Sequence, residues 1–182
     1  MNRIIIIYGL IAGFIVGAMM LITMPMYDKG TLDLDNGELV GYSTMVIALS
    51  LVFVGVKSYR DKHLSGIISF GRAVKVGVLI TLVASVCYAG AWEITYSKIG
   101  DGFMQKMSEH YFQKMKEDGA TEAELAKAKE DWVGYAELYK NPFIRFGVTI
   151  MEIFWVGVVI SLISAGLLRK KEFLPGSETS PS

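Results

Sequence analysis

The spacing of the charged residues constrains this chain most, because it leaves long apolar runs uninterrupted. The runs lie between Arg3 and Asp28, between Glu38 and Lys57, between Lys75 and Glu93, and between Arg145 and Arg169, the last interrupted only by Glu152. Each approaches or exceeds the roughly 17–25 residues with which a helix spans a hydrocarbon core. A soluble helix keeps one face in water and would carry charges more often. The pattern therefore predicts membrane-spanning helices.

Four spans are predicted, at about 4–24, 40–56, 73–96 and 143–168. The first is too long for the apolar part of a signal peptide and is followed by no small-residue cleavage site, so we expect a retained helix. The predicted fold class is all-α, an integral membrane four-helix bundle. Residues 1–171 form its one domain, and residues 172–182, rich in Pro, Gly, Ser and Thr, are predicted to be a disordered cytoplasmic tail.

The basic residues predict the orientation of the spans. Five of them flank the segment between spans two and three, namely Lys57, Arg60, Lys62, Arg72 and Lys75. Others precede span one or follow span four, namely Arg3, Arg169, Lys170 and Lys171. Short flanks rich in Lys and Arg stay in the cytoplasm. Both termini are therefore predicted to be cytoplasmic.

Residues 97–142 are too polar for the bilayer and are predicted to form an extracytoplasmic helical hairpin. One apolar stripe consists of Phe103, Met107, Tyr111 and Met115, and a second of Leu125, Ala128, Trp132, Tyr135 and Tyr139. Asp118 and Gly119 should end the first helix. Thr121 and Glu124 have the spacing of a capping box, which starts the second. The two stripes could pack on each other or lie on the membrane surface.

Small residues on two spans predict close helix packing. Gly9, Gly13 and Gly17 recur every four residues on span one, and Gly77 belongs to a similar row on span three. Such spacing lets another helix approach to backbone contact. Two interpretations stay open for span one, packing within the bundle and a seam between two copies of the chain.

Four polar residues near the outer ends of spans three and four form a candidate pocket. Arg145, Thr149 and Glu152 share one helical face, and Glu93 ends the small-residue row of span three. A charged group inside a span costs about 2.5–3.5 kcal/mol on insertion scales, so Glu152 needs an offsetting partner. Either it only fixes helix rotation, or Glu93, Arg145 and Glu152 line a pocket that binds a proton, an ion or a small polar ligand.

Other site classes have little support in the sequence. Cys87 is the single cysteine, so no disulfide or metal-thiolate site can form within one chain. His63 and His110 are predicted on opposite sides of the membrane, and phosphate-binding, dinucleotide and hydrolase motifs are absent from the sequence. We expect no enzyme activity, no metal and no cofactor. The formal net charge of zero also makes nucleic acid an unexpected partner.

The glycine-bearing first span, the basic turn Ile67-Ile68-Ser69-Phe70-Gly71-Arg72-Ala73 and the segment from Ser69 through Gly77 to Glu93 resemble a family. Its members are bacterial membrane proteins grouped as the domain of unknown function DUF4199, and the resemblance covers nearly the whole chain except the tail. It implies a bacterial inner (plasma) membrane location and a compact helical architecture. It implies no activity and assigns no role to any residue.

Two functional hypotheses remain from the sequence. The favoured one is an accessory or scaffold protein, in which span one and the hairpin contact another membrane protein or a second copy in a homo-oligomer. The alternative is a small transporter or channel component in which Glu93 and Glu152 bind a proton or cation. The lipid bilayer is a partner in both.

Overall fold

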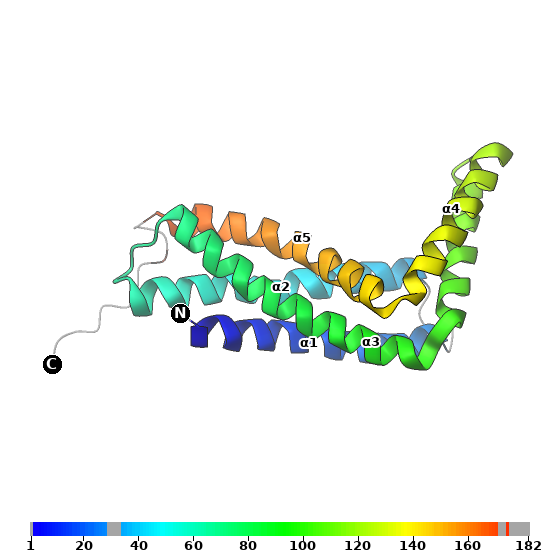
Figure 1. The fold of residues 1–182 in the computed structure, drawn as a ribbon. Coiled ribbons are helices and arrows are strands. Elements are labelled where there is room, and N and C mark those ends of the chain that lie inside the picture. Colours follow the sequence, from blue (N-terminus) through cyan, green and yellow to red (C-terminus); the bar gives the residue numbers. More distant parts are fainter. Residues whose placement is uncertain (1, 29–33, 171–173, 175–182) are drawn as a thin grey trace.

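The computed structural model describes residues 2–28, 34–170 and 174, which are helical almost throughout. Five helices follow one another, α1 Asn2–Asp28, α2 Leu34–His63, α3 Phe70–Glu117, α4 Glu122–Lys140 and α5 Pro142–Leu168 (Figure 1). No strand occurs in these ranges. The predicted all-α class is confirmed. The predicted tail, residues 172–182, lies outside the described residues apart from Leu174.

Four segments are long and apolar enough to cross a membrane, namely Asn2–Tyr27, Asn36–His63, Phe70–Gly100 and Pro142–Leu168. They run alongside one another as a bundle (Figure 1). Large apolar side chains cover the outside, including Phe14, 74% exposed, and Ile47, 69% exposed. Such a surface suits lipid and would be a liability in water. The four predicted spans are confirmed as helices, and the architecture is that of a multi-pass membrane protein.

The helices extend beyond the predicted spans, most clearly in α2, which begins at Leu34 and ends at His63. Hydropathy marks only the apolar part of a span, whereas backbone hydrogen bonding continues the helix through charged residues at its ends. Lys57 and Asp61 illustrate this, because they pair across one helical turn at 2.6 Å. The polar ends therefore belong to the same helices.

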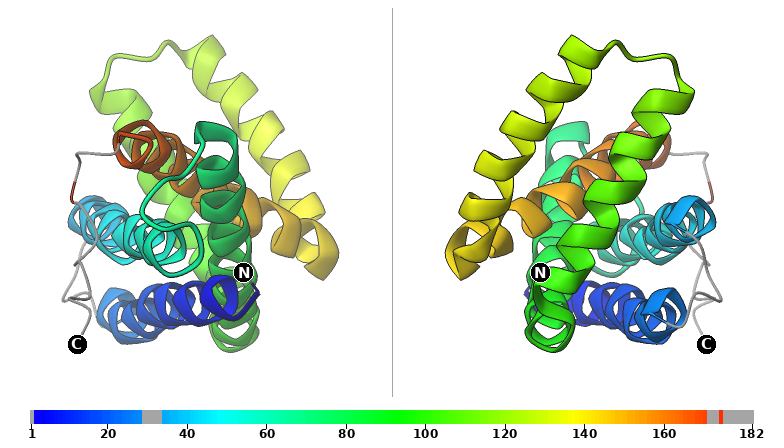
Figure 2. Two further views of the ribbon diagram at one scale, coloured as in Figure 1. Left: turned by 90° about the vertical axis from the view of Figure 1, so that its left-hand side faces the viewer. Right: turned by 90° about the vertical axis from the view of Figure 1, so that its right-hand side faces the viewer.

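Helix α3 lies at the centre of the bundle and contacts every other helix (Figure 2). The glycines of α1 face it closely. A Cβ atom added at Gly9 would lie 2.5 Å from the Cβ of Val83, and one at Gly13 would lie 2.6 Å from the Cβ of Cys87. Gly17 faces Ala91 in the same way, at 3.1 Å.

A second face of α3 packs as closely on α5. A Cβ atom at Gly77 would lie 2.7 Å from the Ser161 hydroxyl, and one at Gly157 would lie 2.1 Å from a methyl carbon of Thr81. Small residues at such positions let two helix backbones approach, which is the usual packing device where lipid removes the hydrophobic drive between helices. The glycines thus hold α3 between α1 and α5.

The hairpin is not separate from span three, because α3 continues into it. Gly100 interrupts α3 with φ +50° and ψ −145°, a backbone conformation open mainly to glycine. Beyond this break the rest of α3 and all of α4 project from one end of the bundle, across its axis (Figure 1). The hairpin is therefore anchored at both ends, through α3 on one side and α5 on the other.

The predicted boundaries of the hairpin helices agree with the structure. Gly119, at φ +85°, follows the end of α3. Thr121 and Glu124 form the complete capping box at the start of α4, with the Glu124 carboxylate accepting from the Thr121 amide at 2.8 Å. The Asn141 side chain accepts from the Phe143 amide at 2.9 Å and caps α5.

The two apolar stripes of the hairpin pack on each other. Tyr111 stacks on Trp132 with ring centroids 5.8 Å apart, and Phe112 meets the same indole edge-on at 6.0 Å. Aromatic pairs of this kind contribute about 0.5–1.5 kcal/mol beyond their buried area. These contacts hold the two arms together as one unit.

Candidate functional site

An ion pair joins the base of the hairpin to the bundle. Arg145, on the first turn of α5, donates from Nε to Oε1 of Glu93 at 2.9 Å and from Nη2 to Oε2 at 2.5 Å. This two-pronged geometry is specific to a guanidinium and a carboxylate. The Arg145 side chain is 8% exposed and that of Glu93 is 25% exposed, so the pair is largely shielded from solvent.

Carbonyl and aromatic groups complete the surroundings of Arg145. Its Nη1 donates to the carbonyl of Tyr139 at 3.1 Å, at the end of α4. The guanidinium also lies 4.0 Å from the ring centre of Tyr96, a cation–π contact. A buried charge is tolerated when it is paired and hydrogen-bonded in this way. We call Glu93, Arg145 and Tyr139 the clamp.

A hydrogen bond between two aromatic residues extends the clamp. The Trp92 indole donates to the Tyr139 hydroxyl at 2.8 Å, and both side chains are buried. Burial raises the pKa of the Tyr139 hydroxyl to about 12, and side-chain hydrogen bonds with Thr149 and Trp92 oppose that rise. Tyr139 therefore stays neutral at physiological pH and serves as a fixed hydrogen-bonding group between α3 and α4.

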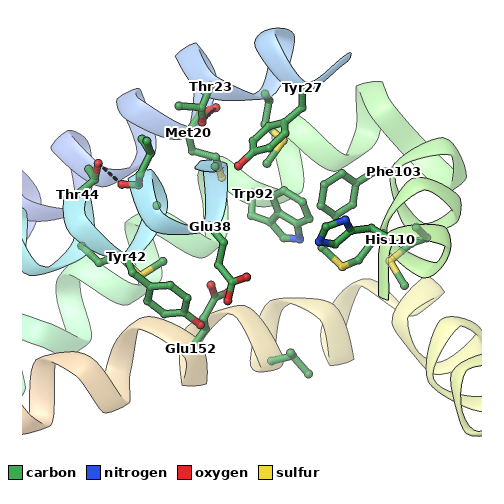
Figure 3. Close-up of a pocket in the computed structure, with 18 of the residues that line it drawn as sticks. Met20, Thr23, Tyr27, Glu38, Tyr42, Thr44, Trp92, Phe103, His110 and Glu152 are labelled. Atoms are coloured by element: carbon green, nitrogen blue, oxygen red, sulfur yellow. Dashed lines mark hydrogen bonds between the residues drawn. The ribbon is translucent and has the colours of Figure 1, made fainter. Parts of the chain in front are cut away.

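A cavity of about 550 Å³ lies between the hairpin and the end of the bundle from which the hairpin projects. Helices α1 to α5 all contribute to its wall (Figure 3). Six of the ten methionines line it, namely Met19, Met20, Met24, Met45, Met104 and Met107. Its volume is within the range of small-molecule sites, about 300–1,000 Å³. The cavity is thus large enough for a ligand and mainly apolar.

Two carboxylates stand on one side of this cavity. Glu152 of α5 and Glu38 of α2 point toward each other, close to the hydroxyl of Tyr42 (Figure 3). Both carboxylates act electrostatically on that hydroxyl. Neither makes a hydrogen bond or ion pair with another residue in the ranges that the structure describes. From the sequence we expected a partner that offsets the charge of Glu152. No side chain among the described residues fills that role.

The structure divides the four residues of the predicted pocket into two groups. Glu93 and Arg145 neutralise each other in the clamp, and the Thr149 hydroxyl donates to the Arg145 carbonyl at 2.9 Å. Only Glu152 lines the cavity. The spacing of Arg145, Thr149 and Glu152 along one helix could not reveal this division. It depends on how α5 packs against α3, which brings Arg145 to Glu93.

Sequence reasoning missed Glu38 as a site residue, because Glu38 lies just before the predicted span 40–56. Its position one turn into α2 brings its carboxylate to the cavity, opposite Glu152. Methionines and aromatic rings near one end of several spans were a usable signal in the sequence, since many of them line the cavity. No group of three or more His, Cys, Asp or Glu side chains in the described part of the chain is placed to hold a metal ion.

Comparison with known proteins gives one family. The family described as "Protein of unknown function (DUF4199)" matches residues 7–170, which include most of the first span, the other three spans, the clamp and the cavity. No curated protein and no solved structure matches the chain significantly.

Proposed function

Because the chain belongs to the DUF4199 family, whose description assigns no activity, we propose a function from the cavity: the protein binds a small, largely apolar molecule at the outer end of its bundle, with Glu152 as the polar anchor. The role is binding rather than catalysis. It serves uptake, export or sensing of that molecule at the membrane. The cavity itself, about 550 Å³ between bundle and hairpin, is the observation that carries the proposal.

The lining supports this role over simple packing. Apolar walls with a few convergent polar groups are typical of small-molecule sites, and methionine side chains adapt to ligands of irregular shape. A structural bundle of this size has no need of such a space, since protein interiors are otherwise close-packed. Glu152 costs folding energy in a span, which a binding role would explain.

The scaffold role predicted from sequence stays a prediction. The surfaces to which it was assigned have partners within the chain: the glycines of α1 face α3, and Trp132 of the hairpin packs on Tyr111. Of the two hypotheses from the sequence, the transporter alternative is closer to the binding function proposed here. Its pair of carboxylates would be Glu38 and Glu152 rather than Glu93 and Glu152.

We place the protein in the bacterial plasma membrane with the hairpin and cavity on the outer side. The termini of the bundle support this orientation. Arg3, Arg72 and Arg169 belong to the end at which α1 begins, α3 begins and α5 ends, and the hairpin lies at the other end (Figure 1). Basic flanks of short loops stay in the cytoplasm.

Methionine-methyl NMR tests the binding proposal directly. Protein labelled with ¹³C at the methionine methyls is placed in lipid nanodiscs and titrated separately with benzyltrimethylammonium and with neopentylbenzene, its uncharged isostere. We expect at least one probe to shift the Met45 and Met104 signals saturably and to leave Met151, which lies outside the cavity and is 46% exposed, unchanged. Shifts that grow linearly and include Met151 would mean partitioning into lipid and would contradict the proposal.

A cavity-filling variant gives a matched control. A Cβ atom at Gly41 meets nothing within 4 Å, and Gly41 lines the cavity, so Gly41→Phe should block probe binding without a backbone clash. Gly90 is equally open but is not part of the cavity wall. Gly90→Phe should therefore bind the probe as the native protein does.

A further inference from the structure

The acidic and basic side chains that line the cavity differ in whether they have hydrogen-bond or ion-pair partners. Glu38 and Glu152 face each other without a hydrogen bond or ion pair to a described residue (Figure 3). His110 and Lys114, the basic residues of the wall, come from the hairpin part of α3, and each already interacts with another group. The unsatisfied charge of the cavity is therefore negative.

Two facing carboxylates in a mostly apolar space call for a cation. Glu152 lies inside a span, where a charge costs about 2.5–3.5 kcal/mol on insertion scales, and the facing carboxylate of Glu38 adds like-charge repulsion. A positive group between them would offset both terms. Because Glu38 and Glu152 come from α2 and α5, such a group would also tie these two helices together.

Aromatic side chains in the same wall suit an organic cation. Tyr88 and Trp92 are buried at 8% and 6% exposure, and Phe103 meets Trp92 edge-on with centroids 5.3 Å apart. Ring faces attract a cation without the cost of removing water from another charge. The clamp already uses this chemistry, with the Arg145 guanidinium over Tyr96.

We propose that the ligand of this cavity is an organic ammonium ion with an apolar or aromatic body, its charge held between Glu38 and Glu152 and its body against Tyr88, Trp92 and Phe103. This inference rests on the proposed function, since it names the class of molecule for the same cavity. An inorganic divalent cation fits less well, because Ca²⁺ and Mg²⁺ need about six or more oxygen ligands and the wall is mostly carbon and sulfur.

The same two probes decide the ligand class. Benzyltrimethylammonium and neopentylbenzene have nearly the same shape and differ in charge. The ratio of their Kd values therefore isolates the contribution of the charge to the binding free energy. We expect the cation to bind at least about tenfold more tightly in native protein. Glu152→Gln and Glu38→Gln should each remove most of that preference and leave the Kd of the neutral probe nearly unchanged, which also shows that the variants fold.

The control variant is Glu109→Gln, which removes a carboxylate from the exposed hairpin surface outside the cavity wall. It should leave both Kd values unchanged. Equal Kd values for the two probes in native protein would overturn the ammonium ligand while the proposed binding function stands. Saturable binding of neither probe would overturn both. A preference for the cation that persists in Glu152→Gln and Glu38→Gln would also overturn the assignment.

Discussion

Arg145 and Glu93 lie 52 positions apart in the chain and form a two-pronged ion pair, with Nε to Oε1 at 2.9 Å and Nη2 to Oε2 at 2.5 Å. The pair connects the start of α5 to the hairpin end of the third span. Because the hairpin leaves the bundle through α3 and returns through α5, this contact closes the base of the hairpin. It thereby fixes one side of the cavity.

Removing one partner of the pair should destabilise the fold. Glu93→Ala leaves the largely buried Arg145 guanidinium without its carboxylate, and we expect a loss of about 3 kcal/mol in the free energy of unfolding. The control is Glu137→Ala, which breaks the exposed pair of Lys140 and Glu137 and should cost at most about 0.5 kcal/mol. Thermal unfolding in nanodiscs measures both, and similar losses would contradict the clamp.

Enlarging a glycine of α1 should loosen its contact with α3. A Cβ atom at Gly13 would lie 2.9 Å from the carbonyl oxygen of Ala84, which belongs to a rigid helix backbone. Gly13→Ala should therefore cost about 1–3 kcal/mol. Gly90→Ala, where the added atom meets nothing within 4 Å, should instead be neutral or stabilising by up to about 1 kcal/mol. Equal stabilities of the two variants would argue against this packing.

The start of α4 should depend on pH. Hydrogen bonds from the Thr121 hydroxyl and the Thr121 amide lower the pKa of Glu124 below its ordinary value, about 4.3. Since the pKa is depressed in the folded state, the cap stabilises α4 above the ordinary pKa, and this contribution is lost as the pH falls through the folded value. Carboxyl-carbon NMR should give a higher Glu124 pKa in Thr121→Ala, and an unchanged pKa would contradict the cap.

Cysteine labelling tests the orientation. In a Cys87→Ser background, we expect a membrane-impermeant maleimide to label Lys127→Cys, on the exposed surface of α4, in intact cells. Lys62→Cys, at the opposite end near the end of α2, should be labelled only after lysis. The reverse pattern would place the hairpin and cavity in the cytoplasm.

The fold was predictable because its determinants are local. Charge-free runs mark the spans, and the caps at Thr121 and Asn141 mark helix boundaries, since both features act within one or two turns. The continuity of α3 into the hairpin was not predictable in the same way. A single residue, Gly100, bends the chain there without ending the helix on either side, and hydropathy cannot distinguish such a bend from a loop.

The site was less predictable because it depends on how the helices cross. The sequence placed Arg145 and Glu152 on one face of α5 and combined them with Glu93. In the bundle, Arg145 turns to Glu93 while Glu152, two turns further, faces α2 and Glu38. Helix rotation and crossing arise from packing at residues such as Gly77 and Gly157, whose effect on a distant carboxylate does not follow from spacing along one helix.

Infrared difference spectroscopy of protein in lipid shows whether the carboxylate of Glu152 anchors the ligand of the cavity. Benzyltrimethylammonium is added to native protein and to Glu152→Gln under identical conditions, and the carboxyl bands are compared. We expect a saturable change in a carboxyl or carboxylate band of native protein that is lost in Glu152→Gln. A spectrum that does not change on addition of the cation, or that changes equally in both proteins, would contradict it.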